Sequence, residues 1–432
     1  MTTDDRLVRD LPGILGELAD GPYPDYIDAL LADSATVRQR PGWTFPEWWL
    51  PMLDTVRRPL LVTAIPWRPI LLVILLLALL FAAALYAGGP RPLPAPFGPA
   101  SNGVVAYDGN GDIFMADPQT GAESAIVSGP NVDLGPRFSL DGTRLAFERK
   151  VDGDRSQVYV VRTDGRELTL VTPEPVRLAA GDFGRRWQRY EFGPDGRTLL
   201  IAGARTGPGT MTIANTDGSG TRTLDVGMTV SEPSFRPPLG REILFNGTDG
   251  VSSGLFVVDV VTGAVRPIVQ LDLGHGLAGP SWSPDGSQIA YWMWSDQVEG
   301  MSARTHVILA DGSGDRELPS PPGAVWNAHA AWSNDGSRLF IARGYTPDNQ
   351  DVRGAVIPAD GSGFGREIAP TVSVETGCCA AWMWSPDDTK ILGRPDGLAT
   401  GPRALILDVA GGPVREAPWT WSSDLTWQRL AP

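Results

Sequence analysis

Histidine is scarce in this chain, and its three histidines decide whether a metal centre is expected. They are His275, His306 and His329, and none lies in a His-Glu-x-x-His or Cys-x-x-Cys pattern. A zinc site needs three or four converging ligands. The sequence therefore predicts no metal centre and no cofactor.

Oxygen-bearing side chains alternate in DGNGD, residues 108–112. Asp108, Asn110 and Asp112 are spaced as at the start of a calcium loop, but Gln119 stands where such a loop has its bidentate glutamate. Asp-Gly and Asn-Gly pairs are also the usual residues of tight β-turns. We therefore interpret the segment as a hairpin turn.

The two cysteines, Cys378 and Cys379, are adjacent. In an oxidising compartment they could form a vicinal disulfide that stiffens the loop before Trp382. Alternatively they are two small buried thiols, because free cysteine packs like a small apolar residue. The sequence favours the buried thiols, and mass measurement before and after alkylation decides between the two.

A sequence pattern that recurs along the chain indicates the fold that would hold the side chains of any functional site. It joins an aromatic residue, a turn and an apolar run, and its aromatic residues lie 43 to 54 residues apart, near the period of roughly 40 to 50 found in propeller blades. Asp-Gly suits a tight turn between two strands, and the apolar runs are typical of strands buried between sheets. The copies are RFSLDGTRLAF from Arg137, EFGPDGRTLLI from Glu191, SFRPPLGREILF from Ser234, SWSPDGSQIAY from Ser281, AWSNDGSRLFI from Ala331 and MWSPDDTKILG from Met383.

Incomplete copies at the two ends of the repeat region complement each other. Residues 103–121 contain the later strands of a blade without an opening strand, and residues 423–432 resemble an opening strand with Trp427 in the aromatic position. We predict that this last strand completes the first blade and closes the ring. Residues 101–432 then form an all-β propeller of seven four-stranded blades. Six or eight stay open, because one copy has Pro237 and Pro238 at its turn.

The aromatic-Ser-Pro-Asp-Gly turn, the Ile-Ala-Tyr or Leu-Ala-Phe strand and the later Asp-Gly-Ser-Gly turn resemble the WD-like repeats of TolB-type bacterial β-propellers. The resemblance covers nearly all of residues 101–432 and implies the fold. It implies little about activity, because such propellers serve as binding platforms, scaffolds and accessory domains of peptidases. We expect binding and no enzyme activity, since no hydrolase domain follows the blades in this sequence. The alternative is a propeller-type hydrolase acting on glycans with paired carboxylates at the channel.

Candidate ligand-binding residues follow from the architecture of a propeller. Loops that lead into the innermost strands gather around the channel on one face. Ordinary packing between blades is the alternative for each residue, and the repeated Phe and Trp of the motif are interpreted as packing residues. The candidates lie just before the aromatic positions: Trp187, Arg189, His275, Trp326, His329, Glu375 and Cys378.

An uncharged stretch, ILLVILLLALLFAAALYA, occupies residues 70–87. At about 1.5 Å per residue it is long enough to cross roughly 30 Å of hydrocarbon, so we predict one transmembrane helix within residues 69–88. Arg57, Arg58 and Arg68 precede this span, and only Arg91 follows within twenty residues. The positive-inside rule therefore places residues 1–68 in the cytoplasm and the propeller outside. A proline-rich linker, residues 89–100, is expected to be an extended spacer.

The predicted cytoplasmic segment contains two short amphipathic helices, one between Asp10 and Gly21 and one from Pro24 to Arg40. Sixty-eight residues are too few for a large independent core. The stretch RPGWTFPEWWLPM follows at residues 40–52. Its aromatic side chains are either membrane-interface anchors or the hot spot of an interface with a cytosolic protein. They are Trp43, Phe45, Trp48 and Trp49.

Composition agrees with this layout. The chain has 432 residues, a net charge of −14 and no basic stripe, so nucleic acid is not an expected partner. The sequence predicts a type II, single-pass cell-membrane protein with an extracytoplasmic binding propeller. Its expected partners are an envelope protein or polysaccharide on the propeller and, for a sensor resembling an anti-sigma factor, a cytosolic regulator on residues 1–68. An envelope scaffold without signalling is the alternative.

Overall fold

The computed structural model describes residues 98–178, 189–203, 210–272, 275–295, 302–347, 351–368, 382–393, 404–420 and 424–431, with Val73, Leu75 and Leu76. The chain divides into two compact units, Met1–Gly89 and Pro90–Pro432. Val73, Leu75 and Leu76 are helical and exposed, and within the described residues no helix has the length and apolar character to cross a membrane. The rest of the predicted span and the predicted cytoplasmic segment, with Trp43, Phe45, Trp48 and Trp49, lie outside the described residues and stay predictions.

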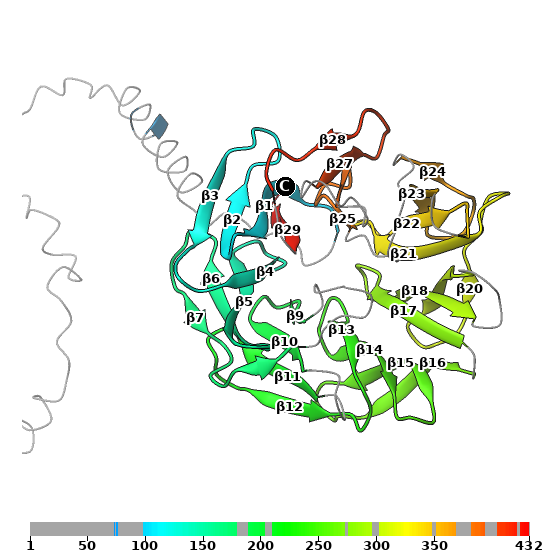
Figure 1. Cartoon of the computed structure of the whole chain (residues 1–432), viewed down its shortest axis with the longest axis horizontal. Coiled ribbons are helices and arrows are strands. Elements are labelled where there is room, and N and C mark those ends of the chain that lie inside the picture. Colours follow the sequence, from blue (N-terminus) through cyan, green and yellow to red (C-terminus); the bar gives the residue numbers. More distant parts are fainter. Residues whose placement is uncertain are drawn as a thin grey trace, which may run out of the picture. The chain divides into compact units, whose positions relative to one another are not determined.

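The second unit is a ring of seven antiparallel sheets, which confirms the predicted seven-bladed propeller (Figure 1). Blade 1 contains β29 (Leu425–Leu430), β1 (Ser101–Gly109), β2 (Asp112–Ala116) and β3 (Glu123–Val127). Blade 2 contains β4 (Asp133–Phe138), β5 (Arg144–Asp152), β6 (Arg155–Arg162) and β7 (Thr169–Leu170), and β8 (Val176–Arg177) also pairs with β6. Blade 3 contains β9 (Tyr190–Phe192), β10 (Thr198–Ala202), β11 (Thr210–Asn215) and β12 (Arg222–Asp225).

The remaining four blades follow in chain order, each from its innermost strand outwards. Blade 4 contains β13 (Ser231–Phe235), β14 (Glu242–Thr248), β15 (Ser253–Asp259) and β16 (Val265–Leu271). Blade 5 contains β17 (His275–Trp282), β18 (Gln288–Ser295), β19 (Arg304–Leu309) and β20 (Arg316–Glu317). Blade 6 contains β21 (Trp326–Trp332), β22 (Arg338–Gly344), β23 (Val352–Pro358) and β24 (Arg366–Glu367). Blade 7 contains β25 (Trp382–Trp384), β26 (Lys390–Gly393), β27 (Leu405–Asp408) and β28 (Arg415–Glu416).

The C-terminal strand closes the ring, as predicted. β29 pairs antiparallel with β1, with Trp427 opposite Val105 and Leu425 opposite Tyr107. The two strands, red and blue-green in Figure 1, lie side by side although they come from opposite ends of the repeat region. Closure leaves no long inner edge of blade 1 unpaired.

The core consists of apolar clusters between neighbouring blades. Leu145 and Phe147 of β5 pack against blade 1, whereas Ala146 of the same strand packs against blade 3. The equivalent cluster between blades 7 and 1 contains Leu392 and Trp427. The second strand of such a blade is therefore buried on both faces. For this reason its sequence is a continuous run of apolar residues.

Serine and aspartate shape the repeated turn. In blade 5 the Ser283 hydroxyl donates to Asp285 Oδ1 (2.6 Å) and accepts from the Gln288 N–H (2.9 Å). Gly286 has a φ of 70°, which glycine adopts freely. The Pro-Pro copy of blade 4 forms its turn as well, since the Arg236 N–H donates to the Glu242 carbonyl (2.8 Å).

Blade 7 departs from the repeat because Asp388 stands where the turn glycine is expected. Its φ is 57°, and its carboxylate accepts hydrogen bonds from the backbone N–H groups of Asn334 (2.7 Å) and Asp335 (2.9 Å) in blade 6. The acidic side chain thus joins two neighbouring turns, which offsets the strain of a left-handed residue.

Candidate functional site

The inner strands of blades 2, 4, 5 and 6 contain a bulge just before the aromatic residue of the repeat. Three positions before that residue the backbone is left-handed, a conformation that glycine adopts freely and that costs other residues about 1–3 kcal/mol. The residues are Gly135 (φ 66°), Glu232 (φ 53°), Gly279 (φ 63°) and His329 (φ 62°). Glu232 and His329 therefore keep a side chain at a strained position where two other blades have glycine.

His329 lies between blades 5 and 6 at the edge of the central channel. It is 6% exposed and packs against Trp292 of β18, with ring centroids 5.0 Å apart. Neither Nδ1 nor Nε2 has a hydrogen-bond partner among the described residues. A buried polar atom without a partner costs about 1–3 kcal/mol. His329 thus has two nitrogens that make no hydrogen bond among the described residues and are themselves covered from solvent.

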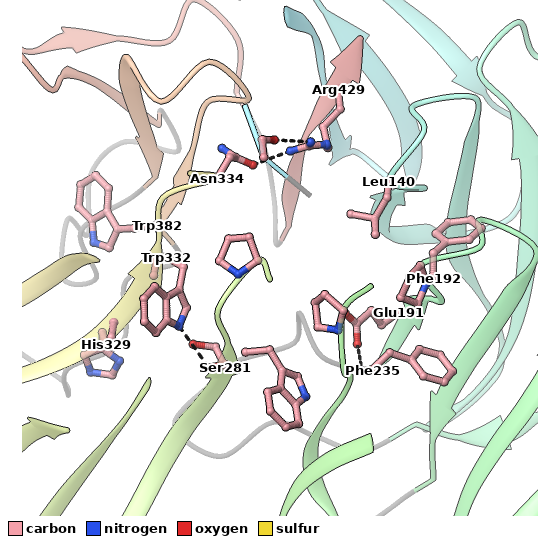
Figure 2. A pocket seen from close by; sticks show the side chains of 17 residues that line it. Leu140, Glu191, Phe192, Phe235, Ser281, His329, Trp332, Asn334, Trp382 and Arg429 are labelled. Carbon is pink, nitrogen blue, oxygen red and sulfur yellow. Dashed lines mark hydrogen bonds between the residues drawn. The ribbon is translucent and has the colours of Figure 1, made fainter. Parts of the chain in front are cut away.

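His329 also lines a cavity of about 330 Å³ in the channel, on the side of the ring where the repeated turns lie. Residues two positions after the aromatic residue form one part of its wall: Leu140, Pro194, Pro237, Pro284, Asn334 and Arg429. Aromatic side chains form another part: Phe192, Phe235, Trp282, Trp332 and Trp382. Figure 2 shows Asn334 and Arg429 on one side of the cavity, Glu191 on another and Trp332 with Trp382 on a third. An apolar wall with a few polar groups is typical of a ligand site.

Two of the motif tryptophans, Trp282 and Trp332, pack between blades and also line this cavity. Trp282 Nε1 donates to the Ser234 carbonyl (3.4 Å), and Trp332 Nε1 donates to the Ser281 carbonyl (3.2 Å). Each bond reaches the preceding blade. Because the indole N–H groups are used in this way, these two rings offer apolar surface to the cavity.

Arg429 provides the positive charge at the rim of the cavity. Its Nη1 donates to Asn334 Oδ1 (2.5 Å) and its Nη2 to the Gly98 carbonyl (2.6 Å). Burial lowers the pKa of Arg429 from its ordinary value, although the carboxylate of Asp388 opposes this. The rim therefore combines a guanidinium, an amide and the backbone of the segment that enters the propeller.

Glu191 is the carboxyl group among the described residues of the cavity wall. Its Oε2 accepts the Phe235 N–H (3.0 Å). Burial raises the pKa of Glu191 to about 8, even though this hydrogen bond and the charge of Arg137 both favour the ionised form. At neutral pH the carboxyl group is then mainly protonated, so it is able to donate a hydrogen bond to a ligand.

We expect Glu191→Gln to remove part of the alkaline loss of stability. Since the folded-state pKa lies above the unfolded value of 4.5, the stabilisation is complete below pH 4.5 and is lost as pH rises through about 8. At about 1.4 kcal/mol per unit, the shift sets an upper limit of about 5 kcal/mol. Melting temperatures of both proteins from pH 5 to 9 test this. Parallel curves would contradict the raised pKa of Glu191.

Buried charges occupy the channel wall of blades 1 to 3, before the aromatic positions. Arg137 Nη2 lies 3.1 Å from Asp424 Oδ1, and Arg189 Nη1 lies 2.5 Å from Glu148 Oε1. Burial raises the pKa of Asp424 despite the neighbouring Arg137. These pairs join blade 2 to its two neighbours, and we assign them to the framework of the ring.

Among the predicted ligand-binding residues that the structure describes, His329 alone lines the cavity. Arg189 is held by its ion pair, and His275 is exposed at the start of β17. Trp326 is fully buried in the cluster between blades 5 and 6, so a ligand has no access to it and we leave it out of the site. Trp187, Glu375 and Cys378 lie outside the described residues.

Four polar residues of the cavity were missed by the sequence analysis: Glu191, Ser281, Asn334 and Arg429. The signal was present in the repeat. At the second position after the aromatic residue, five described copies have Leu or Pro, whereas Asn334 and Arg429 are polar. Glu191 directly precedes its aromatic residue and carries no comparable signal.

Two motifs that suggest chemistry form ordinary turns. The Gly-x-Ser-x-Gly string at residues 250–254, which makes a nucleophile elbow in hydrolases, joins β14 to β15 in a hairpin, and the Ser252 N–H donates to Asp249 Oδ1 (2.6 Å). The DGNGD segment makes the β1–β2 hairpin, as interpreted from the sequence. Over the described ranges, no three His, Cys, Asp or Glu side chains converge as metal ligands.

Comparison with known proteins gives matches to part of the repeat region. A family model described as the TolB beta propeller domain matches residues 92–275. The uncharacterized peptidase YuxL of Bacillus subtilis (strain 168) is 23% identical over 185 residues, which is 42% of this chain and 24% of the peptidase. The chain thus spans about a quarter of the length of that curated relative.

Solved structures share the fold at low sequence identity. An oligogalacturonate lyase from Vibrio parahaemolyticus aligns with a TM-score of 0.53 and 14% identity, over 73% of this chain and 86% of the lyase. A puromycin-hydrolyzing peptidase of Mycobacterium tuberculosis aligns with a TM-score of 0.50 and 15% identity, over 76% of this chain and 54% of the peptidase. At these identities the matches show the fold alone.

Proposed function

We propose that this protein acts by binding, with the channel cavity of its seven-bladed β-propeller as the ligand site; the match of residues 92–275 to the TolB beta propeller domain supports this. The observation that carries the proposal is His329, a buried histidine with two unpartnered nitrogens in the described structure, kept in a strained backbone beside an apolar cavity. Strain that persists next to a cavity is characteristic of functional sites. The ligand is an envelope protein or polysaccharide.

Binding at this cavity requires a group that interacts with His329 and an acceptor for Glu191. Neutral imidazole has one donor and one acceptor nitrogen, so a hydroxyl or amide of the ligand is a suitable partner. The protonated Glu191 donates to a carbonyl or hydroxyl oxygen. The aromatic and proline wall contacts the apolar part of the ligand.

A hydrolase is the second candidate function, and Glu191 is the observation that favours it. A carboxyl group with a pKa near 8 is suited to act as a general acid. Glycoside hydrolysis needs a second carboxylate, about 5 to 9.5 Å away depending on the stereochemistry. The described wall of the cavity has no second carboxylate, so binding ranks first.

We further propose that the propeller is anchored in the cell membrane by residues 69–88, with residues 1–68 in the cytoplasm. In the sensor version a cytosolic regulator binds the short segment, and in the scaffold version that segment only anchors the propeller. Deletion of residues 1–50 separates the two. The sensor loses its signalling, whereas the scaffold keeps its extracytoplasmic partners.

The binding proposal is tested with a photo-crosslinking residue at Leu140, a partly buried position in the cavity wall, in cells that make the full-length protein. We expect adducts at Leu140 and none at Val261, an 80% exposed control in blade 4. We also expect His329→Phe to remove these adducts. This variant keeps the ring on Trp292 and should melt at the same or a higher temperature, because two unsatisfied polar atoms are gone. Equal adducts at Val261, or adducts that survive in a folded His329→Phe protein, would refute the proposal.

A further inference from the structure

A cavity of about 290 Å³ lies at the seam where blade 7 meets blade 1, and we call it the seam cavity. Blade 7 contributes Lys390, Ile406 and Arg415, and blade 1 contributes residues 117–119 and part of β29. The seam cavity and the channel cavity have no described lining residue in common. The seam therefore offers a binding volume that the proposed channel site does not include.

Arginine recurs at one position of the outermost strands. Arg266, Arg316, Arg366 and Arg415 lie opposite Val257, Val307, Val356 and Ile406 of the third strands. In blades 4, 5 and 6 the guanidinium donates to a carbonyl in the turn after the third strand of the next blade. The acceptors are Ala310 for Arg266 (3.1 Å), Ala359 for Arg316 (2.7 Å) and Ala410 for Arg366 (2.5 Å). At this position arginine therefore links each of these three blades to the next one.

Arg415 of blade 7 makes no such hydrogen bond among the described residues, although it has the same register. The turn that it faces in blade 1 follows β2, and Asp117, Pro118 and Gln119 of this turn line the seam cavity together with Arg415. Arg415 is exposed. A planar guanidinium binds a carboxylate through two parallel, charge-assisted hydrogen bonds. Arg415 is therefore available to bind a carboxylate that enters the seam cavity.

The other charged groups of the seam cavity already have partners. Lys390 Nζ lies 3.5 Å from Asp408 Oδ2 in a partly exposed ion pair. Asp117 Oδ1 accepts the N–H groups of Thr120 (2.9 Å) and Gln119 (2.7 Å), and these hydrogen bonds lower the pKa of Asp117. An ionised carboxylate has about four acceptor sites. Asp117 is thus able to accept one further N–H from a ligand.

Aliphatic side chains form the remaining wall. Ile406 is 3% exposed, and Val104, Pro118 and Leu430 line the cavity with it. Contact with such a wall favours an apolar side chain, because apolar surface is removed from water. A uronic acid has hydroxyl groups in place of an apolar side chain, and burying hydroxyls without partners costs free energy. The wall therefore favours a peptide over an acidic sugar.

We propose that the seam cavity binds the C-terminal residue of a peptide from a partner protein. The carboxylate binds Arg415, the N–H of the same residue donates to Asp117, and an aliphatic side chain packs against Ile406. Capture of a C-terminal carboxylate is a recurring mode of peptide recognition. The bound carboxylate supplies an acceptor at the one seam where Arg415 has no carbonyl partner among the described residues. This site does not depend on the proposed function of the channel cavity.

The test uses the full-length protein purified in detergent and the peptide GSGSL, labelled with fluorescein at its N-terminus. Fluorescence polarisation measures the affinity. We expect the C-terminal amide of this peptide to bind at least tenfold more weakly than the free acid, and Arg415→Gln to cause a similar loss for the free acid. A peptide that ends in glycine instead of leucine should also lose about tenfold. The melting temperature of Arg415→Gln should equal that of the parent, because Arg415 is exposed.

Arg222→Gln is the matched control. Arg222 lies opposite Ile213 in the same register of blade 3, is exposed and does not line the seam cavity, so we expect parental affinity. No binding of the free acid at millimolar concentration, equal binding of acid and amide, or equal losses in the two arginine variants would overturn the proposal. Displacement of the labelled peptide by glucuronate as readily as by unlabelled GSGSL would overturn it in favour of an acidic polysaccharide.

Discussion

Replacing Trp427 with alanine is expected to lower the free energy of unfolding of the propeller by about 3–5 kcal/mol. Trp427 is 6% exposed in the closing strand β29, and its Nε1 donates to the Gly103 carbonyl (3.1 Å). The ring packs in the cluster between blades 7 and 1. Its loss leaves a cavity at the seam that holds the first and last parts of the propeller together. Urea unfolding followed by circular dichroism measures the change.

Leu430→Ala is the matched control for this prediction, because Leu430 lies in the same strand but is 41% exposed. We expect that variant to change stability by less than about 0.5 kcal/mol. Similar losses in the two variants would mean that strand pairing, and not the buried indole, holds the seam. A Trp427→Ala protein as stable as the parent would contradict the observed closure.

Arg137→Ala is expected to destabilise the propeller by about 3–5 kcal/mol at neutral pH. The change leaves Asp424 buried without the guanidinium that now lies 3.1 Å away, while Asp108 and Glu148 add negative charge. The folded-state pKa of Asp424, already raised by burial, should rise further. The variant is therefore closest to the parent at acidic pH, and it loses stability as pH rises through that pKa.

Two comparisons make this prediction specific. In Arg137→Ala with Asp424→Asn, the buried charge is gone, and we expect part of the stability to return at neutral pH. Arg155→Ala removes the exposed partner of Asp152, and no measurable loss is expected there. Denaturant midpoints from pH 4 to 8 report both. A loss in Arg137→Ala that is independent of pH would show that packing of the arginine dominates.

The number of blades could be predicted from the sequence because the blades repeat the same pattern of turn residues and buried apolar residues. The run Leu145, Ala146, Phe147 is apolar throughout since neighbouring blades cover both of its faces. The closing strand was predictable for a related reason, because an incomplete blade at one end needed the extra strand at the other. Even the copy with Pro237 forms its hairpin, so one unusual turn does not change the count.

The cavity was harder to predict, because equivalent positions in a repeat do not have equivalent neighbours. Arg189 and His329 are both three residues before an aromatic position. The residue facing each comes from the preceding blade, ten positions after its aromatic residue, and it is Glu148 in one case and Trp292 in the other. Arg189 is therefore neutralised by an acid, whereas His329 stacks on an indole and keeps its nitrogens unpartnered among the described residues.

Because β29 closes the ring, the first blade is completed only at the end of synthesis. Trp427 and Gly103, which meet at the seam, are 324 residues apart in the chain. At about 5 to 20 residues per second, roughly 15 to 65 s pass between the appearance of β1 and that of its partner strand. During this interval the inner edge of β1 has no strand to pair with, and such edges associate readily with other chains. The inner edge of the nascent first blade therefore has to be protected from other chains until β29 has been made.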